Sequence, residues 1–293
     1  MAELHGVLTA MLTPFAEDGS VDEVAARKLA RHLVENGSHG VVVAGTTGES
    51  PTLGDDEQIS LLRAIKDEIG AEATVICGTG SNDTRHGVHL TKAAAEAGAD
   101  AVLSVTPYYN KPNRAGILAH YEAVAEAAGE VPVILYNIPS RVVINVPPEL
   151  LAELAQIDNV VAVKQANNDE IDKVEGLDVL AGNDDVFLRC LETGGVGGIL
   201  VASHVVGPEM RQIYDAVKAG DSDRAGEIEA GIRPIFEAMT VTAGPIPAKA
   251  ATEMLGLIPS ARMRLPMVEA DSEQRAQVRQ ALEAHGLLSA SAA

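Results

Sequence analysis

Short apolar runs alternate with longer amphipathic stretches along most of this chain. Eight of the runs are only a few residues long and rich in valine, isoleucine and leucine, which is typical of buried strands. These predicted strands are residues 7–11, 40–44, 74–77, 101–105, 133–136, 160–164, 179–181 and 198–201. Between most of them, apolar residues recur at helical spacing. The clearest predicted helices are residues 22–35, 55–68, 84–97 and 116–127, and another opens at Pro147-Pro148.

This alternation of strands and helices predicts an α/β fold, a (β/α)8 TIM barrel. The interval 169–178 leaves little room for a helix between the sixth and seventh strands. After the eighth strand, further helices are predicted at residues 208–219, 222–239, 246–255 and 272–285. We therefore expect a catalytic barrel over residues 1–220 and a carboxyl-terminal helical region over residues 221–293.

Composition agrees with a barrel and narrows the class of protein. With 293 residues and 46% hydrophobic content, the chain is long enough for one large barrel. Aromatic content is only 3%, so branched aliphatic residues must build the core, as is common in barrels. Cys77 and Cys190 each lie in an apolar run, away from any Cys/His cluster, which argues against a disulfide framework or a zinc site. This pattern predicts a reduced, cytoplasmic compartment.

Charge and hydropathy argue against two classes of partner. The net charge is −20, and nucleic acid binding needs a basic surface. The first residues lack a basic region followed by an apolar run, so no signal peptide is predicted. No apolar run approaches the ~20 residues of a membrane helix. His86 and His89 are three residues apart but have no third ligand near them in sequence, so no metal site is predicted either.

Lys164 ends the apolar run Val160-Val161-Ala162-Val163. Alternation along a strand places Val160, Ala162 and Lys164 on one face and the other two valines on the opposite face. A lysine that emerges from an apolar strand is desolvated, which lowers its pKa and frees the lone pair of its amine. A Schiff-base enzyme uses such a neutral amine to attack a ketone. The alternative is a lysine whose charged end simply reaches solvent at the end of the strand.

Other informative residues also follow predicted strands, where barrel enzymes place their active sites. The second strand leads into Gly45-Thr46-Thr47-Gly48-Glu49-Ser50. Its glycines allow close approach of a ligand and its hydroxyl groups can hold a carboxylate, although a tight turn with a helix cap is the alternative. The fourth strand leads into Thr106-Pro107-Tyr108-Tyr109-Asn110, whose tyrosines can serve catalysis, packing or subunit contact.

The fifth strand ends in Tyr136-Asn137-Ile138-Pro139-Ser140-Arg141. Tyr136 lies one strand from Lys164 and can act there as a general acid and base. Arg141 offers a planar fork for a carboxylate, with an exposed salt bridge as the alternative. The run Gly182-Asn183-Asp184-Asp185 and the glycine-rich residues 194–198 suggest close backbone approach at the site, but they also resemble the phosphate sites of barrels.

Together these motifs resemble the dihydrodipicolinate synthase family. The resemblance rests on Gly45-Thr46-Thr47-Gly48-Glu49-Ser50, Thr106-Pro107-Tyr108-Tyr109-Asn110, Tyr136-Asn137-Ile138-Pro139-Ser140-Arg141 and Lys164, with Pro245-Ile246-Pro247-Ala248-Lys249 as further support. It covers nearly the whole chain and keeps the motifs in order. It implies a lyase of the pyruvate-dependent Schiff-base aldolase and N-acetylneuraminate lyase superfamily that works in lysine (diaminopimelate) biosynthesis.

The resemblance also implies a mechanism and catalytic roles. Lys164 would form an imine with pyruvate, and the derived enamine would attack L-aspartate 4-semialdehyde to give 4-hydroxy-tetrahydrodipicolinate. Tyr136, Thr46 and Tyr109 would relay protons, with Tyr109 reaching in from a neighbouring subunit. No metal or organic cofactor would be needed, and the assembly would be a homotetramer, a dimer of tight dimers.

Substrate-binding roles follow from the same resemblance. Thr47 would hold the carboxylate of pyruvate, and Arg141 the carboxylate of the semialdehyde. Ile199 would offer its backbone carbonyl, and Gly182 would lie against the substrate. The lysine-inhibited members use two histidines and a glutamate at positions that correspond here to Asp55, Gln58 and His86, so we predict weak or absent feedback by lysine, although Asn82 and Tyr108 match.

Several alternatives remain open at this point. Val142, Gln165 and Asn183 depart from the residues common in the family. N-acetylneuraminate lyase and the keto-deoxy sugar acid aldolases would keep Lys164 and Tyr136 but usually lack counterparts of Arg141 and Thr47. A phosphate-binding barrel isomerase would instead use the glycines of residues 194–198, and a catalytically inactive barrel would not need the lysine and tyrosine at all.

Overall fold

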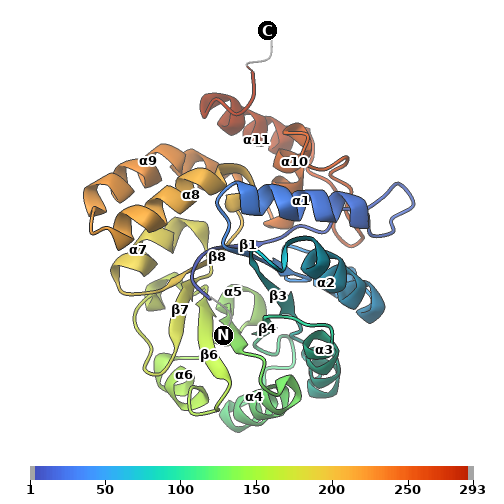
Figure 1. The fold of residues 1–293 in the computed structure, drawn as a ribbon, viewed down its shortest axis with the longest axis vertical. Helices are drawn as coiled ribbons and strands as arrows, with labels where there is room; N and C mark the ends of the chain where they lie inside the picture. The colour runs from blue at the N-terminus through green and yellow to red at the C-terminus, as the bar shows by residue number, and fades with distance from the viewer. Residues whose placement is uncertain (1–3, 290–293) are drawn as a thin grey trace.

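The computed structural model describes residues 4–289 and shows a closed barrel of eight parallel strands (Figure 1). The strands are β1 (Gly6–Ala10), β2 (Gly40–Val43), β3 (Thr74–Gly78), β4 (Ala101–Val105), β5 (Val133–Asn137), β6 (Val160–Gln165), β7 (Asp178–Ala181) and β8 (Gly197–Leu200). Strands that are consecutive in sequence are neighbours in the barrel, and β8 closes the ring by pairing with β1. The predicted (β/α)8 fold is confirmed.

Helices surround the strands and connect them. They are α1 (Glu23–Glu35), α2 (Asp55–Ile69), α3 (Thr84–Glu96), α4 (Arg114–Ala128), α5 (Pro139–Val142), α6 (Pro148–Leu154), α7 (Phe187–Glu192) and α8 (Ser203–Lys218). Single 3-10 turns are η1 (Ser50–Thr52), η2 (Asn168–Glu170) and η3 (Asp184–Val186). Between β6 and β7 the chain forms only η2 and an isolated bridge of Val174 with Leu177, as the shortness of that interval suggested.

Helix α8 begins earlier than its pattern predicts. It starts at Ser203, and helical geometry is interrupted at Val206, where φ is −122°. Pro208 therefore stands in the first turn of the second segment, a position where the missing N–H of proline costs little. The predicted start at Pro208 corresponds to this second segment.

Residues alternate between two apolar layers along each strand. One cluster fills the barrel and includes Leu8, Val42, Ile76, Leu103, Ile134 and Ile199. The other lies between strands and helices and includes Val7, Val41, Val75, Val102, Val133 and Val163. Because barrel interiors are packed with branched side chains, substrates can reach the strands only at one end.

Strand β6 breaks this alternation at its start. Val160 belongs to the outer cluster, whereas Val161 and Ala162 both pack toward the inner one. The cause is a shift in the pairing of β5 with β6, which falls between Val133 and Ile134. The predicted placement of Val160 on the face of Lys164 is therefore wrong.

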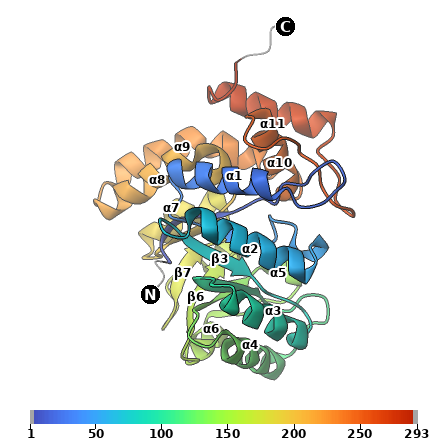
Figure 2. The ribbon, with the colours of Figure 1, turned by 45° about the vertical axis from the view of Figure 1, so that its right-hand side comes forward.

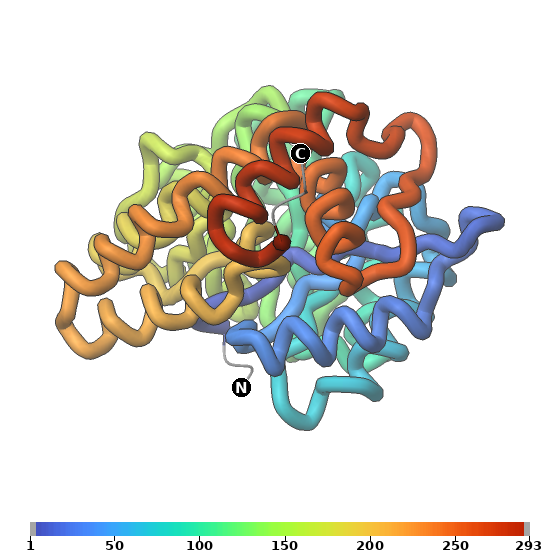
Figure 3. The backbone as a smooth tube through the Cα atoms, turned by 90° about the horizontal axis from the view of Figure 1, so that it is seen from above, coloured from blue at the N-terminus to red at the C-terminus, as the bar shows by residue number. Residues whose placement is uncertain are grey.

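The carboxyl-terminal region packs on one side of the barrel (Figures 1 and 2). It contains α9 (Ser222–Ala238), α10 (Pro245–Met254) and α11 (Ser272–Ala284). Helix α9 packs against α8, and α11 packs against α9 and α10. The segment between α10 and α11 lies beside the loop before α1, where the Arg264 guanidinium donates to the carbonyl of Gly19 at 2.9 Å (Figure 3). The boundary predicted at residue 220 stays a prediction, and residues 290–293 of that region lie outside the described residues.

Candidate active site at the carboxyl ends of the strands

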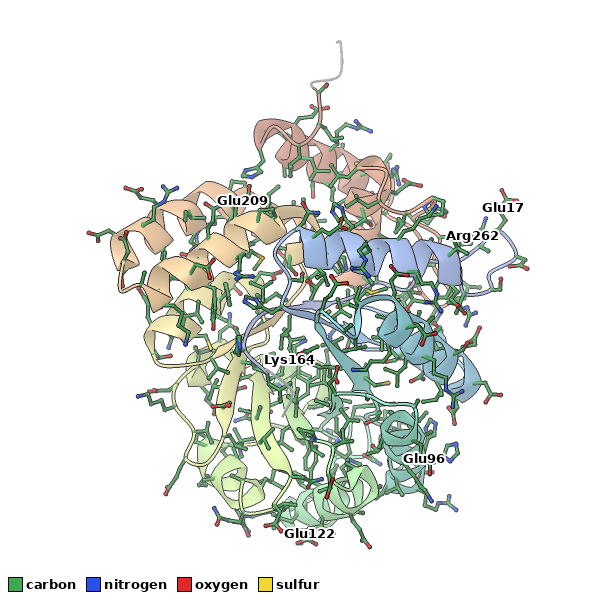
Figure 4. All side chains as sticks on the ribbon, in the orientation of Figure 1. Glu17, Glu96, Glu122, Lys164, Glu209 and Arg262 are labelled. Atoms are coloured by element: carbon green, nitrogen blue, oxygen red, sulfur yellow. The ribbon has the colours of Figure 1, made fainter. Side chains whose placement is uncertain are left out.

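Lys164 and Tyr136 face each other across neighbouring strands inside the barrel. They are register partners of β6 and β5, and each is only 5% exposed. The Lys164 Nζ lies 4.3 Å from the centroid of the Tyr136 ring. Figure 4 shows Lys164 among the strands of the barrel. The predicted pairing of these two side chains is therefore present in the structure.

The surroundings of Lys164 favour its neutral form. The pKa of Lys164 is lowered to about 7, chiefly by burial; the Asp184 carboxylate opposes the shift and the Arg141 guanidinium adds to it. A lysine that titrates near neutral pH carries a substantial fraction of free amine under physiological conditions. The free amine is the nucleophilic form of lysine in Schiff-base chemistry.

Tyr136 is held in its protonated form. Burial raises the pKa of Tyr136 to about 12, against the opposing effects of the Arg141 charge and a hydrogen bond with the Thr46 side chain. A protonated phenol next to the amine can donate a proton and take one back during a reaction. Lys164, Tyr136, Thr46 and Arg141 therefore lie close enough to influence one another's charge: Arg141 affects the pKa of both Lys164 and Tyr136, and Thr46 affects that of Tyr136.

The loop after β2 is folded tightly enough to fix Thr46. The backbone N–H of Glu49 donates to the Thr46 carbonyl at 3.1 Å, and the Thr13 hydroxyl donates to the Gly48 carbonyl at 2.7 Å. Glycine is required on the neighbouring strand, because a Cβ at Gly78 would lie 2.2 Å from the carbonyl oxygen of Ala44. The close approach of β3 therefore sets where this loop leaves the barrel.

A cavity of about 370 Å³ opens beside these residues. Thr46, Tyr136 and Arg141 line it, and its other wall contains Gln58, His86 and Tyr108 among other residues. Lys164 is not one of the lining residues, but it contacts Tyr136, which is. The cavity gives a small carboxylated substrate a path toward the amine.

Gly182 and Ile199 lie at the ends of β7 and β8, near the lysine but outside the cavity lining. The Gly182 N–H donates to the Gln165 carbonyl at 2.8 Å, and a Cβ at Gly182 would lie 2.7 Å from that of Ala166. Ile199 is fully buried in the inner cluster. Thr47 is only 6% exposed and also lies outside the lining.

Asp184 is a functional candidate that the sequence motifs did not single out. Its carboxylate accepts the backbone N–H groups of Val201 and Ala202 at 2.9 and 3.1 Å. Burial raises the pKa of Asp184 to about 6, while these two hydrogen bonds and Lys164 lower it. Its position just after a strand was the available signal, but only the folded structure brings its charge within range of Lys164.

A cluster of side-chain amides at the carboxyl ends of β5 and β6 was also not predicted from the sequence. The Asn137 side-chain amide donates to the Gln165 side-chain carbonyl at 3.0 Å, and the same Gln165 oxygen accepts the Asn167 N–H at 3.0 Å. Asn137 and Gln165 directly follow Tyr136 and Lys164 on β5 and β6. The amide pair therefore ties the two strands together next to the reactive side chains.

Comparisons with known proteins agree with this geometry. The profile of the Dihydrodipicolinate synthetase family matches residues 3–285. The 4-hydroxy-tetrahydrodipicolinate synthase of Cyanothece sp. is 42% identical over 98% of this chain and 100% of that protein. This chain belongs to the dihydrodipicolinate synthetase family. The enzyme of the same name from Parasynechococcus marenigrum is 47% identical over 85% of each chain.

Solved structures of dihydrodipicolinate synthases share the fold. The Cyanidioschyzon merolae enzyme, crystallised with lysine bound, matches with a TM-score of 0.94 and 40% identity over 98% of this chain and 100% of that one. The Thermotoga maritima enzyme matches with a TM-score of 0.93 and 37% identity over 97% and 99%. Family membership confirms the resemblance predicted from the motifs. It favours a synthase of the lyase class over the sialic acid lyase, sugar acid aldolase and isomerase alternatives.

Tyr109 is the one predicted catalytic residue that the single chain does not bring to the site. Its side chain is 88% exposed, and its φ is 71°, in the left-handed region. Its neighbour Tyr108 lines the cavity instead. A role of Tyr109 in its own subunit is therefore not supported by its position.

The positions that correspond to lysine-binding residues of the dihydrodipicolinate synthetase family hold a different set here. His86 Nε2 lies 2.9 Å from an Asp55 oxygen, so the imidazole already has an acidic partner. The Gln58 amide donates weakly to the Ser50 and Leu53 carbonyls at 3.4 Å, and its own oxygen is buried without a hydrogen bond.

Between residues 4 and 289, no group of three His, Cys, Asp or Glu side chains is placed so that it could hold a metal ion. In the same part of the chain, no helix is both long and apolar enough to cross a membrane.

Proposed function

We propose that this protein condenses pyruvate with L-aspartate 4-semialdehyde through a Schiff base on Lys164, giving 4-hydroxy-tetrahydrodipicolinate. The observation that carries the proposal is the buried pair of Lys164 and Tyr136, in a chain whose relatives are synthases of that name. Lys164, whose pKa lies near neutral pH, supplies the nucleophile, and the protonated Tyr136 supplies the acid.

The chemistry proceeds without an external electron sink. The Lys164 amine adds to the ketone carbon of pyruvate, water leaves, and an iminium forms. Loss of a methyl proton gives an enamine, whose carbon attacks the aldehyde of the second substrate. The α-amine of the semialdehyde then adds to the iminium carbon, which closes the ring, and Lys164 leaves as the free amine with release of the product. Tyr136 and Thr46 move protons between these steps, and the buried site protects the enamine from water.

Two carboxylates must be held, and two sites can hold them. Thr47 binds the carboxylate of pyruvate, while Arg141, which lines the cavity, binds that of the semialdehyde. Gly182 and the carbonyl of Ile199 complete the walls around pyruvate. The overall charge of −20 does not prevent anion binding, because Arg141 provides a local cation.

The active assembly supplies Tyr109 from a second subunit. A tyrosine that is 88% exposed in a left-handed loop is suited to insertion into a neighbouring copy. We expect a homotetramer built as a dimer of tight dimers. The enzyme works in the cytoplasm and needs neither a metal nor an organic cofactor.

Intact mass after incubation with pyruvate and borohydride tests the proposal. The wild type should gain one reduced pyruvate adduct, and Lys164→Ala should gain none. Lys173→Ala, which changes an exposed lysine, is the matched control and should retain the adduct. A wild type that gains no adduct contradicts the mechanism. Loss of pyruvate and semialdehyde together, followed in solution, then identifies the second substrate.

A further inference from the structure

A second buried lysine, far from Lys164, forms an ion pair with the loop that carries Thr46. The Lys249 Nζ, on α10, donates to Glu49 Oε1 at 2.5 Å, although the two residues are 200 positions apart. Both side chains are fully buried. The other carboxylate oxygen, Glu49 Oε2, accepts the backbone N–H of Arg264 at 3.1 Å.

The amine of Lys249 is also closely surrounded. It donates to the Arg262 carbonyl at 2.7 Å and lies 4.1 Å from the centroid of the Phe15 ring. Figure 4 shows Arg262 well away from Lys164. Burial lowers the pKa of Lys249, and the Glu49 carboxylate acts in the opposite direction.

Such a pair is a poor source of stability, because apolar residues of similar size often hold a fold equally well. What a buried pair adds is a fixed geometry. Here the fixed residue is Glu49, whose φ of 59° lies in the left-handed region. A non-glycine residue holds this conformation only when its surroundings enforce it.

The backbone of Glu49 connects this anchor to the active site. Its N–H donates to the Thr46 carbonyl, and its own carbonyl accepts the Thr52 hydroxyl at 3.0 Å. Thr46 and Tyr136 line the same cavity, and the Thr46 side chain lowers the pKa of Tyr136. A short chain of contacts therefore runs from the carboxyl-terminal region to the acid of the proposed reaction.

We propose that Lys249 and Glu49 are positioning residues: the carboxyl-terminal region holds the loop of residues 45–50 so that Thr46 reaches Tyr136. This inference rests on the proposed function. Neither residue touches substrate in this scheme, and their effect on the reaction passes through Thr46. The rival explanation is that the pair only joins the two parts of the fold.

A double variant separates the two explanations. Glu49→Leu with Lys249→Met removes both charges, so no uncompensated charge stays buried, and Tm should stay within about 5 °C of the wild type. If the pair positions Thr46, kcat should fall about tenfold to a hundredfold, with a smaller change in the KM for pyruvate. The rate at which pyruvate is trapped on Lys164 should change less than kcat, because the variant leaves the lysine and its surroundings in place.

A matched control uses another ion pair of the same region. Glu253 and Arg275 lie 2.7 Å apart on α10 and α11, away from the loop. Glu253→Leu with Arg275→Met should keep kcat within about twofold. Equal losses of kcat in both double variants, or a Glu49 and Lys249 double variant that keeps wild-type kcat, would overturn the positioning role.

Two further outcomes can be told apart. If the double variant does not fold, the single variant Glu49→Gln tests the positioning role instead. Glutamine keeps the shape of the glutamate side chain and an oxygen that accepts the Arg264 N–H. A several-fold loss of kcat with little change in the KM for pyruvate supports positioning, and an unchanged kcat refutes it. A wild type that fails to trap pyruvate refutes the proposed function itself, whereas a fully active double variant beside an active wild type refutes only this inference.

Discussion

The two buried lysines of this protein show how surroundings decide what a lysine can do. Lys249 contacts a carboxylate at 2.5 Å and a backbone carbonyl at 2.7 Å, so its charge is compensated and its donors are used. In the part of the chain that the structure covers, no carboxylate lies within salt-bridge distance of Lys164, whose neighbour is an aromatic ring. Burial lowers the pKa of both, but of the two only Lys164 lies against a residue that lines the cavity, Tyr136.

The largest expected effect is the loss of catalysis when Lys164 is removed. Lys164→Met should lower the rate of condensation at least about a thousandfold, because no other amine can form the imine. Tm should not fall, since the variant replaces a poorly solvated amine with an apolar side chain. Steady-state kinetics and calorimetry on the same sample check both parts. A Lys164→Met variant that still catalyses the condensation would show that Lys164 is not the required nucleophile.

Lys249→Met should differ from Lys164→Met mainly in stability. It leaves the Glu49 carboxylate buried without its partner, which costs about 3–5 kcal/mol in the free energy of unfolding. Chemical denaturation followed by circular dichroism measures this cost. Pairing the change with Glu49→Leu should recover most of it. A stability equal to the wild type for the single variant would show that Glu49 finds another cation or is protonated.

Tyr109→Phe probes a residue whose side chain is 88% exposed in its own subunit. The exposed position predicts no loss of stability. If the hydroxyl relays protons in a neighbouring subunit, kcat should fall about a hundredfold. Mixing Tyr109→Phe with an inactive Lys164→Met protein supplies the control, because mixed dimers would regain partial activity. The absence of any recovery in dimers shown to be mixed would place Tyr109 outside the partner's site.

The pH dependence of pyruvate capture should respond to two charges in opposite directions. With a Lys164 pKa of about 7, the rate of imine trapping should rise through neutral pH and level off above it. Arg141→Met removes a cation and should raise the midpoint, while Asp184→Asn removes an anion and should lower it, each by up to about one pH unit. Stopped-flow trapping of pyruvate alone isolates this step. Shifts of the same sign would show that the two variants act through structure rather than charge.

The smallest expected effect is that of lysine as an inhibitor. His86 is paired with Asp55, and the cavity wall carries Gln58. We expect little or no change in rate at micromolar L-lysine. Gln58→His is the informative variant, since it restores one histidine of the lysine-inhibited members. Strong inhibition of the wild type in this range would contradict the prediction.

The sequence predicted those features of the fold and site that depend on residues close together in the chain. Strand positions followed from short apolar runs, and the meeting of Lys164 with Tyr136 followed from adjacent strands that end at the same face. The shift in β6 was not predictable, because an extra residue in one strand leaves no mark in its hydrophobicity. The contact of Lys249 with Glu49 depends on how the carboxyl-terminal helices dock, and the influence of Asp184 on Lys164 depends on the curvature of the closed barrel.

The distance in sequence between Glu49 and Lys249 also sets an order of events during synthesis. The loop that carries Thr46 leaves the ribosome early, whereas its anchor on α10 follows 200 residues later. At about 5–20 residues per second, roughly 10–40 seconds separate the two. The six strands β3 to β8 emerge in that interval, so the barrel strands are complete before the anchor arrives. A nascent chain would therefore possess its nucleophile before it can place Thr46, and would become competent for chemistry only near the end of translation.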